Sequence, residues 1–212
     1  MKTLKNLLFF AVISMIAALT FTSCLNSDDD DNSSQYHAYT AAEKAVVMNA
    51  FAGNYTGRIK YYKDNNYTTI DSTAITFTAY ADSNFVMPNF PVSILANYLN
   101  TTDEKSVLTS VSGVNFNATA HLPIYVYNSY FENGYYEYSL IPNNSLSFTS
   151  NGKSVIITFA SYLSSTTTSG QYYYPMCSYY KNQVGGYILI ENISIDGVKT
   201  AVNKPLVFSG TK

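Results

Sequence analysis

The stretch Asn54-Tyr55-Thr56-Gly57-Arg58-Ile59-Lys60-Tyr61 decides the fold, because its residues alternate between two kinds. Every second residue from Tyr55 to Tyr61 is apolar or small, and the residues between them are polar or basic. A period of two indicates a β-strand with one buried face. A polar turn at residues 64–66 and a second alternating run at residues 75–79 extend the pattern.

Beyond residue 113 the chain returns to short alternating runs divided by turn signals. Pairs such as Asn133-Gly134, Asn151-Gly152 and Asp196-Gly197 are typical of tight connections between strands. Short connections place sequence neighbours side by side, so we expect an antiparallel meander. The candidate strands are residues 114–121, 123–131, 135–141, 145–150, 153–160, 171–180, 185–195 and 204–209. The sequence therefore predicts a mainly β domain, closed as a lipocalin-like barrel or, alternatively, folded as a β-sandwich.

Two regions carry helical patterns instead. Thr40-Ala41-Ala42-Glu43 has the spacing of a capping box and predicts a short helix over residues 41–51. Pro91 suits the first position of a helix, and Thr101-Thr102-Asp103-Glu104 is a second capping box. We expect one or two short helices in an insert near residues 91–111.

The N-terminal 23 residues have the layout of a secretory leader. Lys2 and Lys5 precede an apolar stretch, and Phe21-Thr22-Ser23 leads into Cys24. This motif resembles the lipobox of bacterial lipoproteins, although Phe21 stands where leucine is usual. We expect cleavage before Cys24 and attachment to the membrane through lipid on Cys24. An ordinary signal peptide without lipid is the alternative.

A short acidic run follows the cysteine at Asp28, Asp29, Asp30 and Asp31. Adjacent like charges repel one another, which favours a solvated tether over residues 24–38. The run also resembles the acidic export signal of Bacteroidota lipoproteins, which implies an outer-membrane protein facing the cell exterior. A purely mechanical spacer and a periplasmic position remain open. The expected organisation is leader 1–23, tether 24–38 and a single β-rich domain 39–212.

Composition excludes several classes of function. The chain has 12 basic and 14 acidic residues, and Arg58 is its only arginine. Nucleic-acid binding needs a basic face, so it is not expected. No metal-ligand spacing, phosphate loop or nucleophile motif is present, and no cofactor is expected. Cys177 is interpreted as a small buried residue rather than a nucleophile. The protein is therefore predicted not to be an enzyme.

Tyrosine is the remaining compositional signal, with 21 tyrosines and no tryptophan. Clustered tyrosines on strands can form a platform for a glycan or a protein, because each offers an apolar face and a hydroxyl. Cross-strand packing is the alternative explanation. The candidate binding residues are Tyr135, Tyr136, Tyr172, Tyr174 and Tyr179. In addition, Asp71-Ser72-Thr73 resembles an O-glycosylation site of Bacteroidota envelope proteins.

Several of these features occur together in a known type of chain. The chain resembles a family of uncharacterised Bacteroides lipoproteins, classed as a domain of unknown function. The resemblance rests on the lipobox, the acidic tether, the start Gly53-Asn54-Tyr55-Thr56-Gly57 and the Phe90-Pro91-Val92 turn. The Gly-x-Tyr-x-Gly opening is also similar to the first strand of lipocalin-like barrels, where Gly-x-Trp is usual. The family supplies no site residues. We expect a non-catalytic surface lipoprotein that binds an extracellular glycan or protein, or alternatively a structural component of the envelope.

Overall fold

The computed structural model describes residues 35–64, 68–160 and 176–212, together with the course of two strands between 163 and 173. The leader, Cys24, Asp28–Asp31 and Tyr174 lie outside these residues. Residues Gln35–Lys212 form one compact unit. Its elements are β1 (Tyr36–Ala38), α2 (Ala41–Phe51), β2 (Gly53–Tyr62), β3 (Ile70–Ala79), β4 (Asn84–Phe90), η1 (Val92–Tyr98), α3 (Thr102–Thr109), β5 (Val114–His121), β6 (Tyr125–Tyr127), α4 (Asn128–Glu132), β7 (Tyr136–Pro142), β8 (Leu146–Ser150), β9 (Lys153–Ala160), β10 (Leu163–Thr167), β11 (Gly170–Tyr173), β12 (Cys177–Tyr180), β13 (Gln183–Ile195) and β14 (Val198–Thr211).

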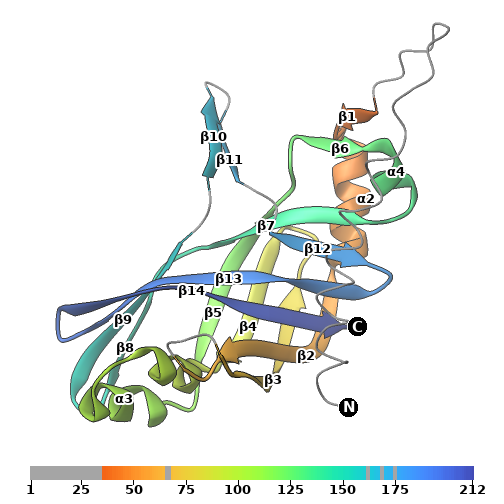
Figure 1. Cartoon of the computed structure of the whole chain (residues 1–212). Coiled ribbons are helices and arrows are strands. Elements are labelled where there is room, and N and C mark those ends of the chain that lie inside the picture. Colours follow the sequence, from red (N-terminus) through yellow and green to blue (C-terminus); the bar gives the residue numbers. More distant parts are fainter. Residues whose placement is uncertain (1–34, 65–67, 161–162, 168–169, 174–175) are drawn as a thin grey trace, which may run out of the picture. The chain divides into compact units, whose positions relative to one another are not determined.

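Eight of the described strands close into an antiparallel barrel (Figure 1). Their order is β12-β7-β5-β4-β3-β2-β14-β13, and β12 also pairs with β13, which completes the ring. Strands β2 to β5 follow one another in the sheet as a meander. The prediction of a mainly β, antiparallel barrel is confirmed, and the sandwich alternative is not what the chain forms.

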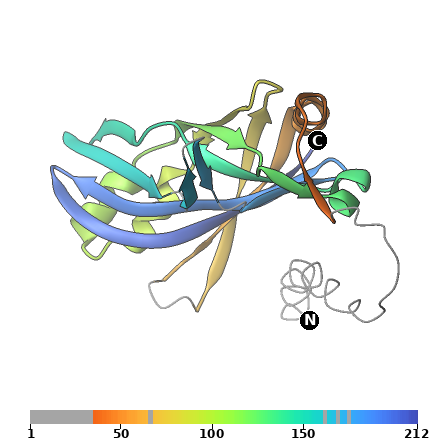
Figure 2. The ribbon, with the colours of Figure 1, turned by 90° about the horizontal axis from the view of Figure 1, so that it is seen from above.

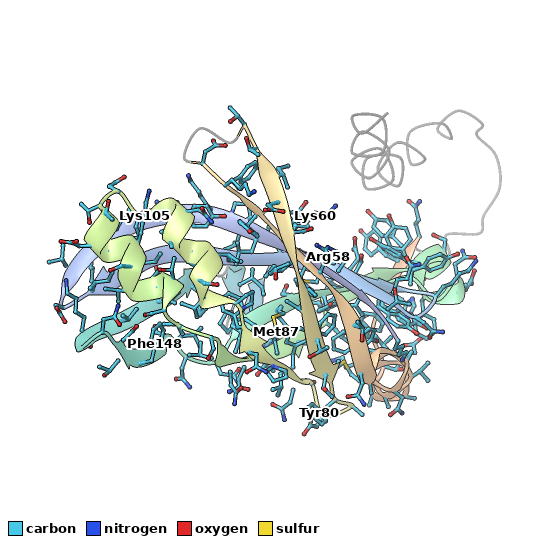
Figure 3. The ribbon with its side chains drawn as sticks, turned by 90° about the horizontal axis from the view of Figure 1, so that it is seen from below. Arg58, Lys60, Tyr80, Met87, Lys105 and Phe148 are labelled. Atoms are coloured by element: carbon cyan, nitrogen blue, oxygen red, sulfur yellow. The ribbon has the colours of Figure 1, made fainter. Side chains whose placement is uncertain are left out.

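The β13–β14 hairpin is longer than the barrel and carries a second sheet region beside it (Figure 2). The first part of β13 pairs with β12, whereas its later part, Leu189–Ile195, pairs with β9. Strand β8 then pairs with β9 at the edge of the sheet. Helices η1 and α3 lie against this region (Figure 3), and the Ser150 hydroxyl donates to the Val107 carbonyl at 2.7 Å. The helical insert near residues 91–111 is thus confirmed as two short helices.

The barrel interior is filled by aromatic side chains. Tyr55 stacks on Phe77 with ring centroids 4.9 Å apart, and Phe77 lies 5.0 Å from Phe85 and 5.6 Å from Phe208. Each of these four residues is at most 1% exposed. A methyl group on Gly210 would lie 2.7 Å from the Phe77 ring, so this position needs glycine. Side chains therefore occupy the space in which a wide barrel would hold a ligand.

Both capping boxes form as predicted. The Thr40 hydroxyl accepts from the Glu43 amide while the Glu43 carboxylate accepts from the Thr40 amide, and Thr101 and Glu104 do the same for α3. At the other end of α2, the Lys212 ammonium group donates to the carbonyls of Ala50 and Ala52. The Lys212 side chain therefore caps the C-terminus of the helix.

The structure differs from the expected elements at β1 and at β6. Residues 36–38, which were expected in the tether, form β1 and pair with β6, and the compact unit spans Gln35–Lys212. The strand predicted over residues 123–131 is instead β6 followed by α4. Both differences have one physical cause, since a three-residue strand is stabilised by its distant partner and leaves almost no periodicity in the sequence.

Candidate functional site

A short two-stranded ribbon, β1 with β6, presents tyrosines to solvent. Tyr36 pairs with Tyr127, and Ala38 pairs with Tyr125. Because successive side chains of a strand alternate between faces, Tyr36, Tyr125 and Tyr127 share the outer face. Their exposed fractions are 51%, 58% and 44%, whereas Val126 on the inner face is 5% exposed. Large apolar rings are thus held on the surface by the register of the ribbon.

The tyrosines continue from the ribbon onto α4 and the neighbouring strands. The Tyr130 ring lies 5.2 Å from Tyr127 and 4.8 Å from Tyr135, and Tyr135 lies 6.4 Å from Tyr180. At the far end, the Lys181 ammonium group is 4.9 Å from the centre of the Tyr180 ring. We call this set the tyrosine row; it consists of Tyr125, Tyr36, Tyr127, Tyr130, Tyr135 and Tyr180.

Neighbouring rings of the tyrosine row meet at steep angles. Their interplanar angles lie between 57° and 79°. Edge-to-face contact is a favourable arrangement for aromatic pairs, because the positive ring edge meets the negative face. The row is therefore an uneven, knobbed surface of ring edges and hydroxyls rather than a flat platform.

A polar cluster fastens the row to the rest of the barrel unit. The His37 ring lies between two acceptors, with Nδ1 2.7 Å from the Asn128 side-chain oxygen and Nε2 2.9 Å from the Glu43 carboxylate. These contacts, first the one to Asn128 and then the one to Glu43, raise the pKa of His37 above its ordinary value. His37 thus joins β1 to the start of α4 and to the first turn of α2, grouped together in Figure 1.

The tyrosines predicted from the sequence fall into three groups. Tyr135 is half-buried and belongs to the tyrosine row. Tyr136 and Tyr179 are 7% and 8% exposed and stack on each other at 5.9 Å, which corrects the expectation that they form an exposed platform. Alternation along β7 turns Tyr136 inward and leaves Tyr135 outside. Tyr174 and the side chain of Tyr172 lie outside the described residues.

Five members of the row were not among the predicted site residues: Tyr36, Tyr125, Tyr127, Tyr130 and Tyr180. Tyr36 was assigned to the tether, and residues 125–130 were assigned to one strand. The sequence signal that could have found them is the Tyr125-Val126-Tyr127 alternation, which places two tyrosines on one face. The common face of Tyr36, Tyr125 and Tyr127 depends on the pairing of β1 with β6, which the local sequence does not reveal.

The other candidate groups lie apart from the row. Cys177 is buried, as predicted, and its burial raises the pKa of the thiol to about 12, so it stays protonated at neutral pH. Partial desolvation of its ring lowers the pKa of His121. Across the part of the chain that the structure describes, no three His, Cys, Asp or Glu side chains converge on a metal position. Within the same residues, every helix is too short or too polar to cross a bilayer.

Comparison with protein families gives a match over most of the barrel unit. The family model described as a domain of unknown function (DUF4840) matches residues 50–195, which is more than half of the chain and includes most of the barrel. Comparison with curated proteins and with solved structures gives no significant match. The matched region contains five members of the tyrosine row and leaves out Tyr36.

Proposed function

The chain belongs to the DUF4840 family, and we propose that it is a lipid-anchored, non-catalytic binding protein of the cell envelope. The sequence around Cys24 supports the anchor, and the geometry of the barrel unit supports the binding role. In this proposal the lipid on Cys24 holds the protein in the outer membrane, and the tether Asp28–Asp31 directs it to the outer face. The barrel domain then binds an extracellular partner. The observation that carries the proposal is the tyrosine row.

The geometry of the row favours a protein as that partner. Tyrosine is enriched in protein interfaces because its ring buries a large area while its hydroxyl finds a polar contact. The steep angles between neighbouring rings favour an interdigitating protein surface over a stacked sugar chain. Lys181 adds a positive charge at one end, which suits an acidic residue at the partner's rim.

Photo-crosslinking on intact cells tests the row directly. p-Benzoylphenylalanine placed at Tyr125 or Tyr127 should give a discrete crosslinked protein band. Val198, at the start of β14, is the matched control because it is 66% exposed against 58% for Tyr125. A band at the Tyr positions and none at Val198 is the expected result. Equal bands at all three positions, or none, would contradict the proposed binding surface.

A separate pair of measurements tests the anchor and the display. Labelling with an alkyne fatty acid should mark the wild-type protein and leave Cys24→Ala unlabelled. Brief protease treatment of intact cells should remove the barrel domain. Replacing Asp28–Asp31 with asparagines should protect the domain while fatty-acid labelling continues. A domain that is protected in the wild-type protein would place it on the periplasmic face and overturn the surface display.

A further inference from the structure

A second surface feature is independent of the tyrosine row. A pocket of about 360 Å³ lies where the β3–β4 turn, strand β5 and the β7–β8 turn meet. Figure 3 labels Tyr80 at the edge of the barrel, on the side away from η1 and α3. The residues that matter for its chemistry are Tyr80, Asp82, Asn84, Asn117, Asn143 and Asn144. The volume is at the small end of the range for ligand sites in proteins.

Backbone hydrogen bonds fix the two turns that form the pocket. The Tyr80 amide donates to the Asn84 carbonyl at 2.8 Å, and the Ala120 amide donates to the Ser83 carbonyl at 2.8 Å. On the other side, the Asn143 amide donates to the Asn117 carbonyl at 3.0 Å. Both turns are therefore tied to β5. The walls of the pocket are held by the barrel itself.

The side chains around the pocket are mostly amides whose hydrogen-bonding groups face solvent. The Thr119 hydroxyl donates to the Asn143 side-chain oxygen at 2.8 Å, which leaves the Asn143 Nδ2 group as a donor. The side chains of Asn117 and Asn144 bond to no other described residue. Each amide offers a donor and an acceptor close together. The pocket can thus donate hydrogen bonds to the hydroxyl groups of a ligand and accept hydrogen bonds from them.

The charges of the pocket narrow the class of ligand. Asp82 is its one carboxylate among the described residues, and both carboxylate oxygens already accept from Asn84, at 3.1 Å from the backbone amide and 2.8 Å from the side chain. Neither lysine nor arginine lines the pocket, so an anionic ligand gains no counter-charge. Tyr80 is 47% exposed and adds an aromatic face beside the amides.

A neutral ligand with several hydroxyl groups and one apolar face matches this lining. We propose that the pocket binds a neutral sugar residue of a glycan chain. The amides of Asn117, Asn143 and Asn144 bond to the hydroxyls, and the Tyr80 ring covers the apolar face of the sugar. The site does not depend on the tyrosine row and would give the protein a second, separate contact with extracellular material.

Titration followed by NMR tests the proposal on the chain from residue 24 onward carrying Cys24→Ser. The probes are maltotriose, mannotriose, galactotriose and chitotriose, with a trimer of galacturonic acid as the charged counterpart. At least one neutral probe should shift the side-chain amide signals of Asn117, Asn143 and Asn144 with a Kd in the millimolar range or tighter. The acidic trimer should bind at least tenfold more weakly than that neutral probe.

Variants separate the pocket from the rest of the surface. Tyr80→Ala and Asn143→Ala should each weaken binding of the neutral probe at least tenfold. Ile70→Ala is the matched control, since Ile70 is 48% exposed against 47% for Tyr80, lies at the other end of β3, and should leave the affinity unchanged. Absence of shifts with every neutral probe would overturn the proposal, as would Ca²⁺ alone moving the same signals. The crosslinking experiment at Tyr125 does not involve the pocket. Failure of the sugar titration would therefore leave the proposed function untouched, and the two proposals can fail separately.

Discussion

The barrel interior and the tyrosine row are both built from aromatic rings, and they differ in what covers those rings. In the interior, Tyr55 is 1% exposed, stacks on Phe77 at an interplanar angle of 8°, and donates its hydroxyl to the Phe51 carbonyl. In the row, Tyr125 is 58% exposed and meets Tyr36 edge to face. Rings covered by other protein atoms stabilise the fold, whereas rings open to water contribute little stability and remain available to a partner.

The largest expected effect is in the interior. Phe77→Ala should lower the free energy of unfolding by about 3–5 kcal/mol, because Phe77 contacts Tyr55, Phe85 and Phe208 and a cavity would remain. Urea unfolding followed by circular dichroism measures this change. Phe77→Leu keeps most of the volume and should cost clearly less. A loss below about 1 kcal/mol for Phe77→Ala would mean that the interior is looser than the ring contacts indicate.

Adding a methyl group to the same interior tests whether it is tightly packed. Gly210→Ala should destabilise the protein by about 1–3 kcal/mol, since its Cβ would lie 2.7 Å from the Phe77 ring. Gly185→Ala is the matched control, because its Cβ would lie 3.4 Å from the nearest backbone oxygen. Unfolding curves of the two variants should therefore differ clearly. Equal curves would indicate that the Phe77 ring moves aside without cost.

The Lys212 side chain, which caps the C-terminus of α2, should contribute less to the free energy of unfolding than the interior rings do. Lys212→Met removes the two hydrogen bonds to the Ala50 and Ala52 carbonyls and should cost about 1 kcal/mol. Lys199→Met, at an exposed position of β14, should be close to neutral. Thermal unfolding of both variants under the same conditions measures the difference. Comparable melting temperatures would show that Lys212 does not stabilise the helix end.

The polar cluster around His37, beneath the tyrosine row, should make the free energy of unfolding of the protein depend on pH. The folded state raises the pKa of His37, first through Asn128 and also through Glu43, so it binds the proton more tightly than the unfolded chain does. The resulting stabilisation is complete below the unfolded pKa of about 6.5 and is lost as pH rises through the folded pKa. NMR titration of His37 and unfolding curves over this window test the prediction. A stability difference between wild type and His37→Gln that does not change with pH would contradict it.

Local sequence was enough for the features that local contacts determine. The helix at residues 41–51 and the second capping box follow from Thr40, Glu43, Thr101 and Glu104, whose partners lie three residues away. Alternation likewise predicted most of the strands and the antiparallel barrel, although not β6 and α4. Closure of the ring could not be assigned to particular strands, because β12 joins β7 to β13 across a long excursion through β8 to β11.

The arrangement of the tyrosine row depends on long-range strand pairing, which the local sequence does not reveal. Tyr135 is among the residues predicted from the sequence, and its ring lies between those of Tyr130 and Tyr180. Tyr136 has the same residue type and is its sequence neighbour, yet it turns into the barrel and stacks on Tyr179. Tyr36 needed knowledge of its pairing with Tyr127, which is far away in the sequence. Composition shows that tyrosine is abundant, and only the strand register shows which tyrosines are exposed.

The triple variant Tyr36→Ala/Tyr125→Ala/Tyr127→Ala tests the central claim most directly, because stability and binding can be measured on one protein. Surface substitutions of this kind usually change the free energy of unfolding by no more than about 0.5 kcal/mol each. We predict a nearly unchanged urea midpoint. Benzoylphenylalanine placed at Tyr135 should crosslink the partner on intact cells when the other three tyrosines are present, and should give no crosslink in the triple variant. A large loss of stability would show that the three rings belong to the core, and an unchanged crosslink would show that they do not bind the partner.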